Sequence, residues 1–400
     1  MNKMKCMILK NITIYSERKR IECGFLMAKD GKIVAFGSMD DINDLEFKGE
    51  IIDFHALPDY KVIPGMIDIH IHGVNGADTM DATQEALKRM AAALPMEGTT
   101  SFLATTMTQE PQAIENALMN AGQYIDDHQP PGMAEIVGIH LEGPFVNPKM
   151  AGAQPAQYMI DPDIHIFKKW NELSNDHVKV VTLAPEQPGG SELIRYLKEH
   201  GIVASIGHSD ATYDEVDQAI SDGATQVTHL FNQMKGLHHR EPGVAGAALL
   251  RDELKAEMIM DGIHVRPEII KLAYKQKSKE GLLLITDSMR AKCLKNGTYD
   301  LGGQDVTVKD GKAVLADGTL AGSILKMGQA VKNLLSYTNC PLEDAIEMAA
   351  LNPAKQLQLD DRKGSIKVGK DADLVILNEE NEVVMTICRG EMAYSIMEVE

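Results

Sequence analysis

The amino-acid sequence predicts an α/β protein: a (β/α)8 TIM barrel with a small β-sandwich domain formed from both termini. Eight short apolar segments alternate with helix-like segments through the middle of the chain, the pattern of a parallel sheet with helices outside it. Both ends of the chain instead alternate apolar and polar residues, as half-buried strands do. Metal-ligand and acid/base side chains stand at the ends of the apolar segments, where a barrel builds its active site.

The small domain is predicted to combine residues 1–62 with residues 358–400. The first part contains the alternating runs Met7-Ile-Leu-Lys-Asn-Ile-Thr-Ile and Lys32-Ile-Val-Ala-Phe, with an Asp-Gly turn pair before the second run. The last part returns to alternation in Gly364-Ser-Ile-Lys-Val-Gly-Lys-Asp-Ala-Asp-Leu-Val-Ile-Leu. Because both ends are rich in β signals, we expect them to pair into one domain beside the barrel.

The barrel is predicted to span residues 63–357. Its expected strands cover residues 66–72, 100–104, 136–142, 178–184, 203–208, 226–230, 257–261 and 282–287. Apolar residues at helical spacing lie between them, at 84–94, 111–125, 192–200, 213–222 and 267–280, and after the eighth strand at 325–337 and 342–351. An open doubly wound sheet is the alternative, but no Gly-x-Gly-x-x-Gly sequence follows any early strand. The small residues in 319–327 could form a phosphate nest before a helix, but a turn that closes the barrel is the preferred interpretation.

Composition excludes several classes of function. The chain has 400 residues, with 58 acidic and 40 basic side chains and a formal charge of −18, which repels nucleic acid and anionic membranes. Its five cysteines are far apart and contain no Cys-x-x-Cys spacing, so neither a disulfide framework nor a thiolate zinc site is expected. The sequence shows neither a leader nor an apolar stretch of about 18 residues, and we therefore expect a cytoplasmic protein.

The first predicted barrel strand carries a His-x-His pair, in Val62-Ile-Pro-Gly-Met-Ile-Asp-Ile-His70-Ile-His72. Side chains alternate between the faces of a strand, so His70 and His72 point the same way with Asp68 below them, and the isoleucines pack on the other face. Two imidazoles are thereby directed at one point. A single pair of this kind is more often two hydrogen-bonded core histidines, so the remaining strands decide the interpretation.

Four other predicted strands end in titratable side chains. The third ends in Glu142, the fifth in His208, the sixth in His229 and the eighth in Asp287. Each residue alone could be a helix cap or a core histidine, but six such residues at equivalent strand ends are hard to explain that way. Nitrogen and oxygen ligands of this mixture suit zinc, iron(II) or manganese. Such an ion lowers the pKa of bound water to about 7 and polarises a carbonyl group, which predicts a hydrolase.

Two loops add candidates at the same end of the barrel. Asp261-Gly-Ile-His264 follows the seventh strand, and His264 could donate to a developing oxyanion or bind substrate hydroxyls, whereas Asp261 is better explained as a loop cap. Gly236-Leu-His-His239-Arg240-Glu-Pro-Gly is the best anion-binding candidate, with a solvated turn as its alternative. In so acidic a chain, a cationic loop beside the active site favours an anionic substrate.

Taken together, these segments resemble the N-acetylglucosamine-6-phosphate deacetylases of the amidohydrolase superfamily. The resemblance covers nearly the whole chain and rests on Pro64-Gly-Met-Ile-Asp-Ile-His-Ile-His-Gly, His140-Leu-Glu-Gly-Pro-Phe, Gly207-His-Ser-Asp-Ala, Thr228-His-Leu-Phe-Asn, His239-Arg-Glu-Pro-Gly, Asp261-Gly-Ile-His-Val and Thr286-Asp-Ser-Met-Arg-Ala-Lys. The first motif is generic to the superfamily, whereas the second and fifth are more specific. The resemblance implies hydrolysis of the acetamide of N-acetylglucosamine 6-phosphate. The galactosamine or mannosamine epimer is the alternative substrate, and a non-catalytic scaffold is a more distant one.

The resemblance also implies a ligand set. Glu142, His208 and His229 would hold the main ion, zinc or iron. His70 and His72 would bind a second ion that Glu142 bridges, so one or two ions per subunit are expected.

Asp287 would be both a metal ligand and the catalytic acid/base, taking a proton from the attacking water and delivering it to the amine. His264 would assist it by contacting the acetyl carbonyl or the sugar hydroxyls.

The substrate side is implied in the same way. Asn232 would hold the 6-phosphate, and Arg240 would reach across a homodimer to the same group, with His239 beside it. The chain departs from the family pattern at Gln154, where Gly-Ala-His is common, at Gln233, where Asn-Ala-Met is common, and at Ser288, where Asp-Ala is common. These three positions are expected to flank the substrate rather than the metal.

Overall fold

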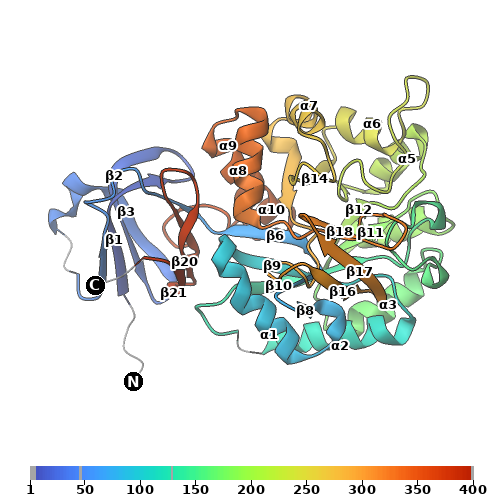
Figure 1. Ribbon diagram of the computed structural model, residues 1–400, viewed down its shortest axis with the longest axis horizontal. Coiled ribbons are helices and arrows are strands. Elements are labelled where there is room, and N and C mark those ends of the chain that lie inside the picture. The colour runs from blue at the N-terminus through green and yellow to red at the C-terminus, as the bar shows by residue number, and fades with distance from the viewer. Residues whose placement is uncertain (1–5, 45–46, 128, 398–400) are drawn as a thin grey trace.

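The computed structural model describes residues 6–44, 47–127 and 129–397 (Figure 1). Residues 1–5 and 398–400, which belong to the predicted small domain, lie outside the described residues. Figure 1 shows a β-rich unit, made of the blue and red ends of the chain, beside a larger unit of strands and helices.

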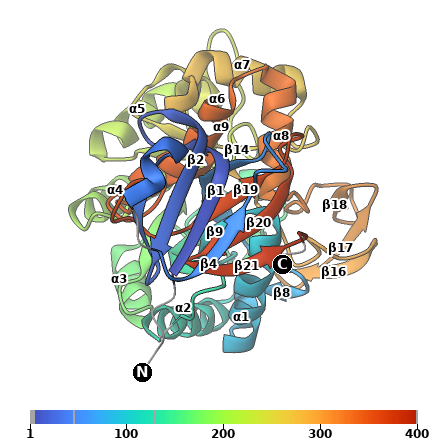
Figure 2. The same ribbon diagram turned by 90° about the vertical axis from the view of Figure 1, so that its left-hand side faces the viewer.

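The small unit is built on one sheet to which both ends of the chain contribute. Its strands are β1 (Cys6–Tyr15), β2 (Arg20–Lys29), β3 (Lys32–Ser38), β4 (Glu50–Asp53), β5 (Lys61–Pro64), β19 (Leu374–Leu377), β20 (Val383–Cys388) and β21 (Glu391–Ser395). The order is β21-β20-β19-β5-β1-β2-β3, with β4 beside β1. The antiparallel β5–β19 pair joins the two ends of the chain. Figure 2 shows the blue N-terminal strands and the red C-terminal strands together in this unit. The predicted pairing of the termini is confirmed, while the domain limits at 62 and 358 stay a prediction.

Eight parallel strands form the barrel, in the predicted order. They are β6 (Met66–Ile71), β9 (Thr99–Thr105), β10 (Glu135–Glu142), β11 (Val178–Leu183), β12 (Val203–Ile206), β13 (Gln226–Val227), β14 (Lys255–Ile259) and β15 (Leu282–Ile285). A parallel bridge between Ile71 and Ser288 joins the last strand to the first. The barrel prediction is therefore confirmed.

Helices surround this sheet (Figure 1). They are α1 (Gln84–Ala93), α2 (Pro111–Asp126), α3 (Ile164–Leu173), α4 (Gly190–Glu199), α5 (Tyr213–Asp222), α6 (Gly243–Leu250), α7 (Pro267–Lys277) and α8 (Met327–Thr338), followed by α9 (Leu342–Ile346), a π-helical turn (Glu347–Leu351) and α10 (Asn352–Gln356). Helix α6 consists only of glycine, alanine, valine and leucine, so it has no polar face and its spacing did not mark it as a helix. None of the helices in the described ranges is long and apolar enough to cross a bilayer.

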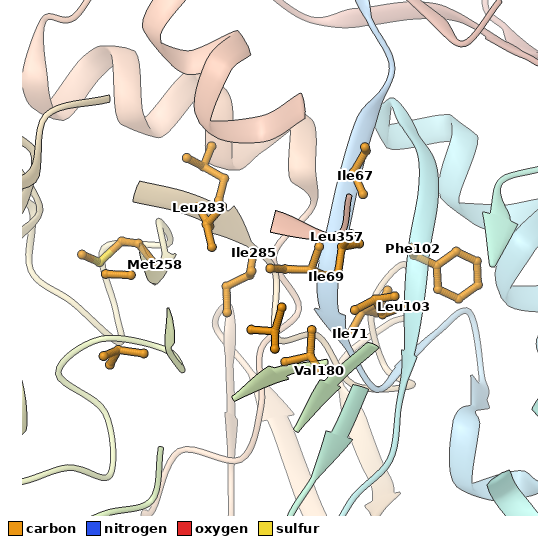
Figure 3. Close-up of a cluster of buried hydrophobic side chains, with 14 of the residues drawn as sticks. Ile67, Ile69, Ile71, Phe102, Leu103, Val180, Met258, Leu283, Ile285 and Leu357 are labelled. Carbon is orange, nitrogen blue, oxygen red and sulfur yellow. The ribbon is translucent and has the colours of Figure 1, made fainter. Parts of the chain in front are cut away.

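The core explains why the first barrel strand presents its histidines inward. Ile67, Ile69 and Ile71 of β6 are at most 1% exposed, and Figure 3 shows them among Leu103, Leu357 and other apolar side chains. Burying each of them contributes about 1.5–3 kcal/mol to stability. Because side chains alternate along a strand, this packing turns the residues between the isoleucines toward the barrel interior.

An antiparallel sheet that the sequence interpretation did not predict lies between β15 and α8. It consists of β16 (Gly297–Leu301), β17 (Gln304–Lys309) and β18 (Lys312–Val314). The segment 319–327 that follows it meets the barrel through a parallel bridge between Ser288 and Ser323. Part of this segment also lines the cavity described below.

Candidate metal centre and active site

A cavity of about 380 Å³ opens where the barrel strands end. Nine of the predicted site residues line it: His72, Glu142, Gln154, His208, His229, Asn232, Gln233, His264 and Asp287. His70 belongs to the same cluster of side chains but is fully buried. The structure therefore brings together residues that are more than 200 positions apart in the sequence.

Three of these residues lie two positions beyond a strand end. The strands β12, β13 and β15 stop earlier than predicted, because His208, His229 and Asp287 have φ angles of 48°, 31° and 47°. This left-handed region ends an extended strand, and residues other than glycine adopt it at a cost of roughly 1–3 kcal/mol. Backbone strain of this kind is concentrated at functional sites.

The first cluster consists of Glu142, His208 and His229. Oε1 of Glu142 lies 3.3 Å from Nε2 of His208 and 3.2 Å from Nε2 of His229, and the two Nε2 atoms are 3.1 Å apart. Nδ1 of His208 is 2.7 Å from the carbonyl oxygen of Met150. Since that carbonyl only accepts, Nδ1 donates to it and Nε2 is left with a free lone pair toward the cluster.

The second cluster consists of His70, His72 and Asp287. Oδ1 of Asp287 lies 3.5 Å from Nε2 of His70 and 3.3 Å from Nε2 of His72. Oε2 of Glu142 is 3.2 Å from the same Nε2 of His72. Oε1 of Glu142 also lies 3.5 Å from Nε2 of His70. The carboxylate of Glu142 therefore lies between the two clusters and contacts both, the placement that a bridging carboxylate needs.

The charges at this centre match a cation site. Burial opposes ionisation of Asp287, but the imidazoles of His70, His72 and His229 outweigh it and lower the pKa of that carboxyl to about 2. Burial also opposes protonation of His72, yet hydrogen bonds with Asp287 and Glu142 raise the pKa of its imidazole to about 10. Among the described residues, Nε2 of His70 has no hydrogen-bond partner. A divalent ion would satisfy that atom and neutralise the carboxylates, so these residues fit a metal.

Comparison with known proteins agrees with this chemistry. The profile of the Amidohydrolase family matches residues 61–393. The chain belongs to the amidohydrolase family. It is 48% identical over 395 residues to the N-acetylglucosamine-6-phosphate deacetylase of Bacillus subtilis, with 98% of each chain covered. It is 37% identical to the N-acetylgalactosamine-6-phosphate deacetylase of Escherichia coli O157:H7, over 82% of this chain and 87% of that protein.

Solved structures agree with the sequence relatives. The N-acetylglucosamine-6-phosphate deacetylase of Thermotoga maritima superposes with a TM-score of 0.86 at 37% identity, over 97% of this chain and 100% of that one. A mutant of the Mycobacterium smegmatis enzyme in complex with N-acetyl-D-glucosamine-6-phosphate gives 0.89 at 30% identity, over 98% and 100%. The resemblance found in the sequence is confirmed, and with it the metal dependence that is general to amidohydrolases.

Gln154 lies closer to the metal centre of this amidohydrolase than predicted. Its Nε2 donates to Oε2 of Glu142 at 2.7 Å, and its Oε1 accepts from the main-chain N–H of Thr108 at 2.8 Å. Both ends of the amide are thus engaged, and its orientation is fixed. Gln154 thus contacts the carboxylate that lies between the clusters in addition to lining the cavity, and its position beside the substrate stays a prediction.

His264 is held at the cavity by Asp261. The main-chain N–H of His264 donates to Oδ1 of Asp261 at 2.8 Å, and Nδ1 of the ring lies 2.6 Å from Oδ2. Burial opposes protonation, but these contacts with Asp261 raise the pKa of His264. Asp261 also accepts from the N–H of Ile263 at 2.8 Å, so it is a loop cap as expected and in addition orients the imidazole.

The predicted anion-binding residues are not all brought together within one chain. Asn232 and Gln233 line the cavity, and Nδ2 of Asn232 donates to the carbonyl oxygen of His229 at 3.1 Å. His239 and Arg240 instead lie on an exposed loop, with Nη1 of Arg240 2.7 Å from Nε2 of His239, and neither lines the cavity.

The sequence interpretation missed two sets of residues at this site. Met107, Thr319 and Leu320 line the cavity from loops, and Leu301 lines it from the end of β16; none of these segments carries a titratable motif. Glu257 is fully buried and contacts His70, and its one sequence signal is an acidic residue inside the apolar run Ala-Glu-Met-Ile. A charged residue is almost never fully buried unless it is paired, so that signal could have been recognised.

Proposed function

We propose that this chain hydrolyses the acetamide of N-acetylglucosamine 6-phosphate to glucosamine 6-phosphate and acetate. The observation that carries the proposal is the position of Glu142, whose carboxylate lies between two histidine clusters at the cavity and contacts both, with Asp287 in the second cluster. The identity of 48% to a deacetylase of that name, over nearly the full length of both chains, supports this substrate.

The proposed cofactor is zinc or iron, with one or two ions per subunit. Glu142, His208 and His229 would hold one ion, and His70 and His72, with Asp287, would hold the second. When bound, such an ion lowers the pKa of a water to about 7 and polarises the carbonyl group under attack.

Asp287 is the proposed general acid and base. Its low pKa keeps the carboxylate ionised at neutral pH, so that it can accept the proton of the attacking water. Delivering the same proton to the departing amine returns the carboxylate to its starting state. His264, oriented by Asp261, is proposed to donate a hydrogen bond to the acetyl carbonyl or to a sugar hydroxyl at the same cavity.

The phosphate is proposed to bind at the side of the cavity lined by Asn232 and Gln233. A chain with a net charge of −18 must supply local cations to bind an anionic substrate. Arg240 and His239 are the proposed cations, reaching the phosphate from the partner subunit of a homodimer. A cytoplasmic location is also proposed, since the five free thiols are typical of a reducing compartment.

One observation favours a second candidate substrate. The relative from Escherichia coli O157:H7 that is 37% identical to this chain is a deacetylase of N-acetylgalactosamine 6-phosphate, the C4 epimer. The mannosamine epimer is a third candidate substrate. A non-catalytic scaffold is disfavoured because every predicted metal ligand is present and at the centre.

The decisive test is release of glucosamine 6-phosphate from N-acetylglucosamine 6-phosphate by protein reconstituted with zinc or iron(II). The unphosphorylated sugar and the two epimeric phosphates serve as comparison substrates. We expect strong turnover of the phosphorylated glucosamine derivative and little of the unphosphorylated sugar. Preference for an epimer would replace the substrate while keeping the reaction, and no turnover of any of them by metal-loaded protein would reject the proposal.

A further inference from the structure

Glu257 of β14 is fully buried inside the barrel, and three hydrogen-bond donors converge on its carboxylate. Nε2 of Gln226 donates to Oε1 at 2.7 Å. Oε2 lies 2.9 Å from Nδ1 of His70 and 3.2 Å from the main-chain nitrogen of His229. One carboxylate therefore contacts one proposed ligand residue of each metal cluster.

The contact with His70 selects one form of its imidazole. An ionised carboxylate only accepts hydrogen bonds, so the proton of the pair sits on Nδ1 of His70. In the neutral ring, Nε2 then carries a free lone pair, and this atom lies 3.5 Å from both Glu142 and Asp287. A histidine that ligates metal through one nitrogen commonly donates from the other to such a carboxylate, which fixes the ring and its tautomer.

The contact with His229 supports the backbone instead of the ring. His229 has a φ angle of 31°, in the left-handed region that a histidine adopts only under constraint. Its N–H is held by Oε2 of Glu257, and the next N–H, that of Leu230, donates to the main-chain oxygen of Glu257 at 2.8 Å. Glu257 thus holds the turn that presents the ring of His229 to the cavity.

We propose that Glu257 is a positioning residue for both metal clusters, which sets the tautomer of His70 and fixes the turn that carries His229. The inference rests on the proposed function, because it concerns the metal centre assigned there. The ring of His70 depends on Glu257 directly, whereas His229 is contacted only through its main chain. Loss of Glu257 should therefore reduce metal affinity more at the His70–His72–Asp287 cluster than at the other cluster.

A direct role of Glu257 as a metal ligand fits the geometry less well. His70, His140 and Glu257 have ligand atoms within 4.8 Å of one another. However, both ring nitrogens of His140 already have partners, Nδ1 the carbonyl oxygen of Ile69 at 3.1 Å and Nε2 the hydroxyl of Thr182 at 2.8 Å. An ion at this place would have to break those bonds, so the contacts favour a supporting role.

The variant Glu257→Gln tests the proposal because it preserves size and removes one acceptor oxygen. A glutamine has only one side-chain oxygen, so it cannot accept hydrogen bonds on both of the atoms that Glu257 uses. If its amide nitrogen faces His70, it donates to Nδ1, and the ring proton moves to Nε2. We expect Zn²⁺ titration of the metal-free variant, by competition with a chromophoric chelator, to show the second ion bound about 10–100-fold more weakly and the first ion affected less. Metal analysis after dialysis should give close to one ion per subunit where the unaltered protein retains two.

Glu135→Gln is the matched control, since Glu135 is a largely buried carboxylate at the opposite end of its strand, paired with Arg362 at 2.9 Å and Lys363 at 2.7 Å. We expect it to lower thermal stability without changing Zn²⁺ stoichiometry. If Glu257→Gln does not fold, Glu257→Asp keeps the charge but shortens the reach to His70, and the second ion should again be weakened selectively.

Two outcomes would overturn the inference. One is Zn²⁺ binding in both Glu257 variants that matches the unaltered protein at both sites. The other is a loss in His140→Gln as large as that in Glu257→Gln, which would make Glu257 a direct ligand. Neither measurement involves a sugar substrate, so failure of the proposed reaction would be seen separately.

Discussion

The main-chain N–H of Asp287 donates a hydrogen bond to the carbonyl oxygen of His70 at 2.8 Å. This bond lies where the last barrel strand meets the first, so barrel closure itself sets the proposed acid/base beside a proposed metal ligand. From the other side, the N–H of Ser323 donates to the carbonyl oxygen of Asp287 at 2.7 Å. The backbone of Asp287 is thus held by hydrogen bonds on both sides, and its side chain lines the cavity.

Replacing Asp287 by asparagine should remove the proton transfer while keeping the shape of the side chain. We expect kcat for N-acetylglucosamine 6-phosphate to fall about 10²–10⁴-fold, the usual contribution of general acid–base catalysis. The ion at Glu142, His208 and His229 should remain, as metal analysis would show. Asp252→Asn, on an exposed loop, serves as the control. A variant at position 287 with unaltered kcat would refute the assigned role.

Metal affinity at the His70–His72–Asp287 cluster should rise with pH. The pKa of His72 is raised to about 10 in the metal-free protein, because Asp287 and Glu142 outweigh the effect of burial. At pH 6–8 the imidazole is therefore protonated and must lose its proton to bind metal. We expect the apparent Zn²⁺ affinity to increase up to about tenfold per pH unit for each proton released. Calorimetry in buffers of different ionisation enthalpy would count these protons, and an affinity independent of pH would contradict the assignment.

The raised pKa of His72 also predicts that the stability of the metal-free protein decreases as the pH rises. A histidine with a raised folded-state pKa stabilises the fold fully below its unfolded value near 6.5 and loses that contribution as the pH rises through about 10. The midpoint of thermal unfolding of chelator-treated protein should thus decrease between pH 7 and pH 10. With Zn²⁺ bound the histidine is already neutral, so this decrease should be smaller, and equal slopes in both forms would argue against His72 as a ligand.

Removing Arg240 should weaken phosphate binding. The residue lies on an exposed loop outside the cavity of its own chain, and its proposed contact is with the substrate of a partner subunit. A charge-assisted hydrogen bond contributes about 1.5–3 kcal/mol, so we expect KM to rise roughly 10–100-fold in Arg240→Ala. Arg266→Ala removes an exposed arginine paired with Glu268 and is the matched control. Unchanged KM in Arg240→Ala, with dimers present by sedimentation, would exclude the contact.

Lys363 connects the two units of the fold through buried ion pairs. Its Nζ lies 2.7 Å from Glu135 of the barrel and 2.5 Å from Asp373 beside the terminal sheet. Burial opposes its charge, but the surrounding carboxylates raise its pKa. Glu135 would keep its ion pair with Arg362, but the buried carboxylate of Asp373 would lose its cation. Lys363→Met should therefore lower the free energy of unfolding by about 3–5 kcal/mol.

Urea denaturation of the metal-loaded protein would measure this loss. The control is Lys367→Met, since that side chain is half exposed and lies 3.5 Å from Glu17. An exposed pair contributes at most about 1 kcal/mol. Equal destabilisation by the two variants would show that the buried network around Lys363 does not stabilise the junction.

Much of the metal centre follows from local sequence pattern. Alternation along residues 66–72 predicts that His70 and His72 lie on the face opposite the isoleucines, and in the structure both rings contact Asp287. The end of each apolar segment marks where a strand stops, and a parallel barrel brings all those ends to one face. Periodicity acts over a few residues, so it determines which side chains point inward without information on distant partners.

The partners of those side chains were decided by the tertiary structure. The contact of Glu257 with His70 spans 187 positions, and it depends on closure of the barrel, which leaves only β15 between β14 and β6. The bond from Gln154 to Glu142 depends on how the loop after β10 folds back, although only 12 positions separate the two. The sequence by itself determined the fold class and the inward-facing ligands, because burial and alternation are local. Contacts between different strands and loops depend on barrel closure and register, which no short segment encodes.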